Sequence, residues 1–283
     1  VSHDEGAKLT LSFGDMRVAL KEYIADLAST TAAKEKIESE LKIAKTIQMS
    51  FLPKTFPPFP DQDRFDIFAT LLPAKEVGGD LYDFSMLNED HLFIAIGDVS
   101  GKGVPAALFM AVTKTLMKGM AHPDLPPAEL LEKVNRELAQ DNDTAMFVTL
   151  FCGILDLRTG KLTYSNAGHN PPLIIDGDGQ VDWLEMPTGL VAGVFEQSAY
   201  SSREVEIAPG GMLIAYTDGV TEAMNSADEL YSEKRLMSLA GNLSGKDVKT
   251  VVNEVVTAAK EFCGEAPQSD DITVLALRFG QQH

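Results

Sequence analysis

Four aspartates lie where apolar runs meet glycine or polar residues, a setting that can place a carboxylate at the end of a buried strand. Asp98 and Asp218 each follow an apolar run that is typical of a strand. Asp270 comes just before another such run, and Asp80 follows a pair of glycines. Mg²⁺ and Mn²⁺ prefer carboxylate, carbonyl and water oxygens as ligands. The sequence therefore predicts that these four carboxylates gather around divalent cations.

The chemistry that such a cluster supports is hydrolysis of a phosphate ester. Two cations about 4 Å apart lower the pKa of a shared water and polarise a phosphoryl group. The backbone carbonyl of Val99, next to Asp98, is a further predicted ligand, and neighbouring glycines let the chain approach the ions closely. Zinc is not indicated, because no paired His or Cys residues occur at suitable spacing.

Each aspartate alone is a weak signal, because a strand followed by Asp-Gly is more often only a turn. The hypothesis rests on the number of such sites. His169 is the one histidine in an unusual setting, and a turn histidine bonded to backbone explains it at least as well as a catalytic role. The segment 97–103 is not a Walker loop, because its glycine spacing differs and a glycine follows the lysine.

Composition excludes some classes of function and leaves others open. The chain has 283 residues and a formal net charge of −18, which argues against nucleic-acid binding because that needs a basic face. Cys152 and Cys263 lie outside any CxxC pattern, so we expect a reducing, cytoplasmic location. No apolar run approaches the roughly 18 residues of a membrane helix. Because the chain begins with Val1, a membrane segment upstream remains open.

The first 50 residues carry a heptad pattern that no proline interrupts before Pro53. This pattern predicts a long helix that forms a homodimer through residues 9–48. The alternative is an amphipathic helix that folds back on its own domain. The proline-rich segment 51–63 is expected to be a linker, and 64–283 a globular domain. The heptad positions are Leu9, Phe13, Met16, Leu20, Tyr23, Leu27, Thr30, Lys34, Ile37, Leu41, Ala44 and Gln48.

The rest of the sequence alternates short strand-like segments with four helical ones. Short connections between the strands indicate antiparallel sheets, so we expect an α+β fold with two packed sheets and helices outside. Helices are expected at 105–120, 127–140, 233–241 and 246–262. Strands are expected at 65–72, 80–84, 92–97, 147–156, 161–167, 204–207, 212–216 and 272–279, with a short pair in 171–181.

Five motifs in this order resemble the SpoIIE/RsbU branch of the bacterial PP2C-like (PPM) serine/threonine phosphatases. The resemblance covers about residues 51–280, and it implies an α-β-β-α sandwich with a pair of Mn²⁺ or Mg²⁺ ions. The motifs are Glu76–Asp83, Gly97–Gly103, Asn166–Pro172, Tyr216–Gly219 and Ser269–Thr273.

By position, the resemblance also implies roles for single residues. Asp80, Asp98, Val99, Asp218 and Asp270 match metal ligands of the family. Asp271 aligns with a position that is usually not a ligand, and Asp83 is a weaker candidate. The phosphate-binding arginine of eukaryotic relatives has no clear match, so Lys75 or Lys102 is expected to replace it.

The resemblance extends to partners and regulation. The implied substrate is a phosphorylated STAS-domain protein, an anti-sigma antagonist in a partner-switching pathway, and helices 105–120 and 127–140 are implicated in regulation. Residues 4–16 resemble the end of a HAMP module, which implies a membrane receptor upstream. Two alternatives remain: a catalytically silent module that binds a sigma-factor regulator, and a two-metal hydrolase of small phosphate esters.

Overall fold

The computed structural model describes residues 2–59 and 62–280, with the side chains of 2–12 and 15 left out. The chain divides into two compact units, 1–47 and 48–283. The predicted long helix is present as α1 (Ser2–Phe51), whose last turn belongs to the second unit. No helix within the described ranges is long and apolar enough to cross a membrane.

Helix α1 exposes its apolar stripe to solvent. The side chains of Met16, Leu20, Tyr23 and Leu27 are each 54–66% exposed. Leu9, the first residue of the predicted stripe, lies outside the described side chains. Gln48, its last residue, is 6% exposed and bonds within the globular unit. Gln48 therefore contacts the globular unit of its own chain, and the dimer itself stays a prediction.

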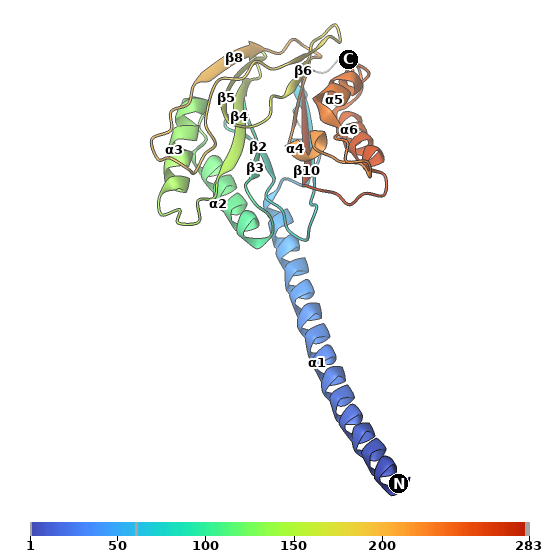
Figure 1. The fold of residues 1–283 in the computed structure, drawn as a ribbon. Coiled ribbons are helices and arrows are strands. Elements are labelled where there is room, and N and C mark those ends of the chain that lie inside the picture. Colours follow the sequence, from blue (N-terminus) through green and yellow to red (C-terminus); the bar gives the residue numbers. More distant parts are fainter. Residues whose placement is uncertain (1, 60–61, 281–283) are drawn as a thin grey trace. The chain divides into compact units, whose positions relative to one another are not determined.

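The globular unit is built on two five-stranded sheets whose paired strands are all antiparallel (Figure 1). The first sheet has the order β1 (Phe65–Leu72), β10 (Ile272–Phe279), β9 (Met212–Tyr216), β6 (Leu173–Ile175) and β7 (Val181–Trp183). The second has the order β2 (Leu81–Met86), β3 (His91–Val99), β4 (Val148–Asp156), β5 (Lys161–Ala167) and β8 (Ser202–Glu206).

Helices cover the outer face of each sheet, which confirms the predicted α-β-β-α sandwich (Figure 1). Helices α2 (Val104–Met120) and α3 (Pro127–Ala139) pack on the second sheet. On the first sheet lie α5 (Ser232–Ala240) and α6 (Val248–Cys263). A single turn, α4 (Asp218–Thr221), was not predicted, because four residues are too few to show a helical period.

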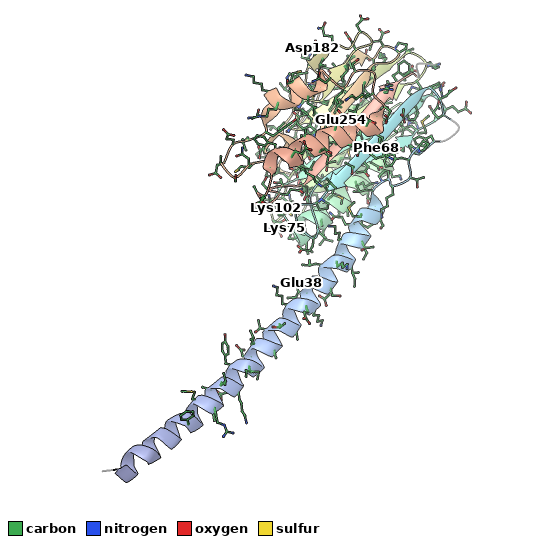
Figure 2. The ribbon with its side chains drawn as sticks, turned by 90° about the vertical axis from the view of Figure 1, so that its right-hand side faces the viewer. Glu38, Phe68, Lys75, Lys102, Asp182 and Glu254 are labelled. Atoms are coloured by element: carbon green, nitrogen blue, oxygen red, sulfur yellow. The ribbon has the colours of Figure 1, made fainter. Side chains whose placement is uncertain are left out.

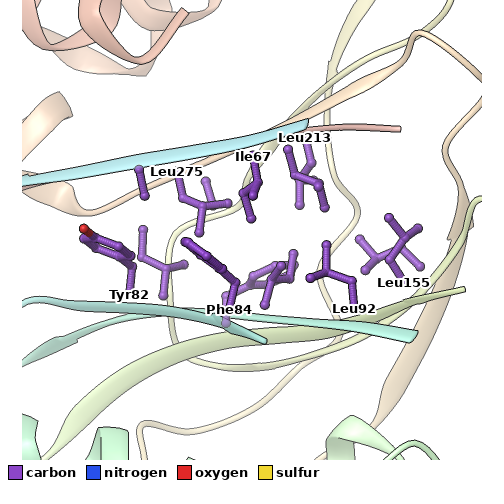
Figure 3. Packing of buried hydrophobic residues seen from close by; sticks show 14 of the residues in the cluster. Ile67, Tyr82, Phe84, Leu92, Leu155, Leu213 and Leu275 are labelled. Atoms are coloured by element: carbon purple, nitrogen blue, oxygen red, sulfur yellow. The ribbon is translucent and has the colours of Figure 1, made fainter. Parts of the chain in front are cut away.

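The main core lies between the sheets, where apolar side chains from both inner faces meet (Figure 3). Strand β1 shows the cause: its residues alternate between buried and half-buried, so one face supplies the core. The segment expected as a linker contributes too, since the ring of Phe56 packs against this core and lies 5.7 Å from that of Phe84. Residues labelled in Figure 3 are Ile67, Leu213, Leu275, Tyr82, Phe84, Leu92 and Leu155.

Candidate metal centre

The four predicted acids come from both sheets and meet at one edge of the sandwich. Asp80 lies just before β2, and Asp98 lies near the end of β3. Asp218 lies two residues after the end of β9, and Asp270 lies two residues before β10. Their charges act on one another, since Asp98 raises the pKa of Asp80 and Asp218 raises that of Asp98. The structure thus brings the four carboxylates into one electrostatic neighbourhood.

Strand β3 continues past its predicted end. The sequence predicts that the strand stops at Gly97, but Asp98 and Val99 still pair with Thr149 and Val148 of β4. Pairing with β4 extends β3 beyond its apolar run, and the sequence of β3 alone does not predict this extension. Asp98 is consequently held by a sheet rather than by a turn, and the turn begins only after it, with Gly101 in a left-handed conformation at φ 84°.

Asp80 is the most deeply buried of the four acids, with 1% of its surface exposed. Burial raises the pKa of its carboxyl well above the usual range, and the nearby Asp98 and Asp271 raise it further. The hydroxyl groups of Thr217 and Thr273 both donate hydrogen bonds to Oδ2 of Asp80 and oppose that rise. A bound cation would offset the repulsion between this buried carboxylate and the neighbouring acids.

The other three acids are only partly buried. Burial and the charge of Asp218 raise the pKa of Asp98 to about 7. Burial, followed by Glu222 and Asp270, raises the pKa of Asp218 to about 6. Asp270 already has a cationic partner, because Nζ of Lys102 lies 2.7 Å from its Oδ2 and also donates to the carbonyl of Ser269. The hydrogen bond to Asp270 raises the pKa of Lys102.

The acids do not form a finished coordination shell. Across residues 2–59 and 62–280, no three His, Cys, Asp or Glu side chains are close enough together to hold a metal ion as they lie. The donor chemistry nevertheless fits hard cations, since the groups are carboxylates plus the carbonyl of buried Val99. A Cβ at Gly79 would lie 2.7 Å from the Val99 carbonyl oxygen, so glycine is needed for this close approach.

Asp271 differs from its neighbour Asp270 in what it contacts. It is buried, and its carboxylate accepts backbone N–H bonds from Ala74 and Gly79, each at 2.8 Å. A Cβ at Gly78 would come 1.8 Å from the Asp271 Oδ2, which explains the glycine there. Asp271 therefore holds the loop that carries Asp80, whereas the carboxylate of Asp270 is more exposed and pairs with Lys102.

Asp83 and Lys75 lie outside the cluster. Asp83, the weaker candidate ligand, forms a buried ion pair with Lys114 of α2, with Nζ and Oδ2 2.7 Å apart. Lys75 is exposed and makes no hydrogen bond or ion pair with any described residue. Figure 2 places Lys75 and Lys102 toward the same end of the globular unit, with Asp182 at the opposite end. Of the two lysines, Lys102 contacts the cluster directly, through Asp270.

His169 connects the two sheets beside the cluster. Its Nδ1 lies 2.8 Å from the hydroxyl oxygen of Thr149 in β4, and its Nε2 lies 3.1 Å from the carbonyl oxygen of Tyr216 in β9. The carbonyl can only accept, so Nε2 carries the proton and Nδ1 accepts from Thr149. Burial lowers the pKa of His169 to about 4, so the ring is neutral at pH 7. This geometry matches a structural bridge rather than a proton donor.

Gln48 contacts the loop of Asp80 from the last turn of α1. Its side-chain amide donates to the carbonyl of Gly78 at 2.6 Å and accepts from the N–H of the same residue at 3.2 Å. The sequence pattern placed Gln48 on the coiled-coil stripe and so missed this contact. A polar residue at an apolar heptad position was the available signal.

Comparisons with known proteins agree with this geometry. A sequence profile of the family described as stage II sporulation protein E (SpoIIE) matches residues 88–280. Protein IcfG of Synechocystis sp. is 34% identical over 84% of this chain, and phosphoserine phosphatase RsbU of Bacillus subtilis is 32% identical over 66%. The SiaA-PP2C domain of Pseudomonas aeruginosa matches with TM-score 0.77 and 24% identity, over 88% of this chain and 99% of that domain.

The paired sheets with helices on both outer faces define the PP2C fold. The chain belongs to the SpoIIE family, whose profile covers most of the globular unit, so the predicted family is confirmed. Four of the five motifs lie within the matched residues 88–280, and Glu76–Asp83 precedes them. The chain spans 41% of the length of IcfG and 55% of that of RsbU, about half of each.

Proposed function

We propose that this chain is a metal-dependent protein phosphatase that hydrolyses phosphoserine or phosphothreonine on a regulatory protein. The convergence of Asp80, Asp98, Asp218 and Asp270 at one edge of a PP2C fold carries the proposal. Two relatives, RsbU and RsbP of Bacillus subtilis, bear the name phosphoserine phosphatase, which supports this class of substrate.

The proposed cofactor is a pair of Mn²⁺ or Mg²⁺ ions, held by the four aspartates and the carbonyl of Val99. The buried, mutually repelling carboxylates support this choice. Among proteins of this fold, PstP has been solved with two manganese ions and RsbX with magnesium. When bound, such ions activate a water and polarise the phosphoryl group.

The chain's own residues would bind and orient the phosphate. Lys102 can donate to a phosphate oxygen after releasing Asp270, because its side chain is 42% exposed. The residue lies between two glycines with positive φ, Gly101 and Gly103. Lys75 is the second candidate, since it is exposed and has no partner among the described residues. Either lysine would replace the phosphate-binding arginine of eukaryotic relatives, which has no clear match in this sequence.

Regulation is proposed to run through α1. The exposed stripe from Phe13 to Leu27 supports a parallel homodimer, which would bury it. Gln48 would pass a rotation of the helix to Gly78 and the loop of Asp80, since it bonds both backbone groups of that glycine. The proposed substrate is a phosphorylated STAS-domain protein in the cytoplasm, and the HAMP-like residues 4–16 would link α1 to an upstream receptor.

The test is release of phosphate from a phosphorylated STAS-domain protein in the presence of Mn²⁺. Asp98→Asn and Asp218→Asn should each lower kcat/KM by about 100-fold or more, because each removes a charged metal ligand. Asp182→Asn is the matched control, since this exposed aspartate lies at the far end of the unit (Figure 2). Activity in both site variants equal to that of the control would contradict the proposal.

The same assay separates the two alternatives. A silent binding module would hold the STAS protein without releasing phosphate and would show no heat of Mn²⁺ binding in calorimetry. A hydrolase of small esters would prefer p-nitrophenyl phosphate over the phosphoprotein at equal Mn²⁺. We expect the phosphoprotein to be the better substrate.

A further inference from the structure

We propose that Thr217 and Thr273 act as a pair of positioning residues that fix the carboxylate of Asp80 for cation binding. The inference rests on the proposed metal-dependent function and adds two residues that are not ligands. Thr273 lies in β10 of the first sheet and Thr217 directly follows β9 of the same sheet, whereas Asp80 precedes β2 of the second sheet. The pair therefore acts across the interface between the sheets.

The contacts are short and fully buried. Oγ1 of Thr217 lies 2.7 Å from Oδ2 of Asp80, and Oγ1 of Thr273 lies 2.5 Å from the same oxygen. Both threonines are 0% exposed and Asp80 is 1% exposed, so water does not compete for these bonds. When Asp80 is ionised, as cation binding requires, these hydrogen bonds are about twice as strong as neutral ones.

The direction of each bond follows from the surrounding backbone. The N–H of Thr273 donates to Oγ1 of Thr217 at 3.0 Å, so the hydroxyl proton of Thr217 must point elsewhere. Its nearest acceptor is Oδ2 of Asp80, while the carbonyl oxygen of Asp271 is more distant at 3.4 Å. Two hydroxyl donors on one oxygen require that oxygen to be unprotonated.

This arrangement assigns different tasks to the two oxygens of Asp80. Oδ2 is occupied by the two hydroxyls. No described hydroxyl or amide group donates to Oδ1, and the remaining side-chain contact of the Asp80 carboxyl is with Asp98, another proposed ligand. Without the pair, the carboxylate could rotate about its Cβ–Cγ bond, because this torsion is soft. The pair thus fixes which oxygen faces the acidic edge.

The threonines also link Asp80 to the acids of the other sheet. Thr217 directly precedes Asp218, and Thr273 lies three residues after Asp270. The N–H of Thr217 bonds to the carbonyl of Thr273 at 3.0 Å, so the two positions move together. A shift of either strand end would consequently move the donors of Asp80 along with Asp218 or Asp270.

The expected effect is on metal affinity. Thr273→Val keeps the shape of the side chain but removes one donor, so we expect Mn²⁺ to bind about 10- to 100-fold more weakly, as for other groups that orient metal ligands. Thr273→Ser restores the hydroxyl and should return the dissociation constant close to that of the wild type. In activity assays the Mn²⁺ concentration for half-maximal rate should rise in Thr273→Val, while kcat at saturating Mn²⁺ should largely recover.

The experiment is calorimetric titration of the full chain with Mn²⁺, with thermal unfolding of each variant as a check on folding. Thr113→Val is the matched control, because Thr113 is equally buried but its hydroxyl bonds only to the Phe109 carbonyl of its own helix. Thr217→Ser and Thr217→Ala form a second pair, so that the result does not depend on one folded variant.

The outcomes distinguish this inference from the proposed function. Wild-type binding of Mn²⁺ with unchanged affinity in Thr273→Val and Thr217→Ala would overturn the positioning role alone. Equal weakening in Thr113→Val would also overturn it, because a loss of general packing would then explain the effect. A wild-type chain that binds no Mn²⁺ would overturn the proposed function and this inference together.

Discussion

At the scale of single residues, His169 shows how burial makes a histidine structural. The ring has a donor on one side and an acceptor on the other, supplied by Thr149 and the Tyr216 carbonyl. Both contacts suit the neutral form, and protonation would place a second N–H against the Thr149 hydroxyl. The neutral ring therefore joins the two sheets next to the acids through these two hydrogen bonds.

A pH dependence of stability follows from this burial. The folded pKa of His169 is about 4, whereas its ordinary value is 6.5, so between these values the unfolded chain binds more protons than the folded one. Its contribution to stability is complete above pH 6.5 and is lost as the pH falls toward 4. From pH 7 to pH 5 we expect it to remove about 2 kcal/mol of unfolding free energy.

Denaturant unfolding at pH 7 and pH 5 measures this loss. Other groups titrate in the same range, so the comparison is with His169→Gln, which has no titrating ring. The wild type should lose about 2 kcal/mol more than the variant between the two pH values. Equal losses in both proteins would show that His169 is not a buried neutral ring.

The sequence predicts the acids of the site better than the groups that support them. Asp98 and Asp218 are visible because each ends an apolar run, which is a local pattern. The donors Thr217 and Thr273 are also local to the motifs, but their partner Asp80 is distant in sequence and lies on the other sheet. No local pattern states where a hydroxyl points, so their role depends on how the sheets pack.

At the scale of elements, one buried ion pair joins α2 to β2. Nζ of Lys114 and Oδ2 of Asp83 are 2.7 Å apart, and their side chains are 8% and 1% exposed. Asp83 also accepts the N–H of Phe84. The sequence suggested Asp83 as a weak ligand because it follows the Asp80 motif, but the alternation of a strand points its side chain at the helix instead.

Breaking this pair from one side should destabilise the fold strongly. Lys114→Met leaves Asp83 buried without a cation, and we expect a loss of about 3–5 kcal/mol in denaturant unfolding. Lys246→Met is the control, because the Lys246–Glu254 pair has both side chains 37% exposed and should cost less than about 1 kcal/mol. The double variant Lys114→Met, Asp83→Leu should recover most of the loss. Similar losses for Lys114→Met and the control would contradict this account.

Strands and helices follow closely from periodicity, and the deviations have physical causes. Strand β3 ends at Val99 rather than at the predicted Gly97, because pairing with β4 extends the ladder by two residues. The proline-rich segment 51–63 packs against the core through Phe56 and Phe59. Its prolines alone indicate only where a helix stops. Both differences come from tertiary contacts that a sequence window does not contain.

At the scale of the whole molecule, α1 joins a solvent-exposed stripe to a buried contact. The apolar side chains from Phe13 to Leu27 are exposed to solvent, while Gln48 at the other end of the helix hydrogen-bonds to the carbonyl of Gly78. In the proposed dimer, a rotation of α1 would therefore reach the loop of Asp80 through Gln48. The phase between stripe and Gln48, rather than the length of the helix, should set the phosphatase output.

Two deletions separate phase from length. Removing Ala32–Lys34 takes out three residues, which breaks the heptad register and rotates one part of the helix against the other. Removing Ala28–Lys34 takes out a full heptad, so the helix is shorter still but the register is preserved. The three-residue deletion should change kcat/KM toward the phosphorylated STAS protein by about 5-fold or more, as expected for a coupled site, whereas the heptad deletion should leave it close to the wild type.

Sedimentation must show that both variants remain dimers. If both deletions give the wild-type rate, α1 is a tether, and if both change it equally, length rather than phase controls the enzyme.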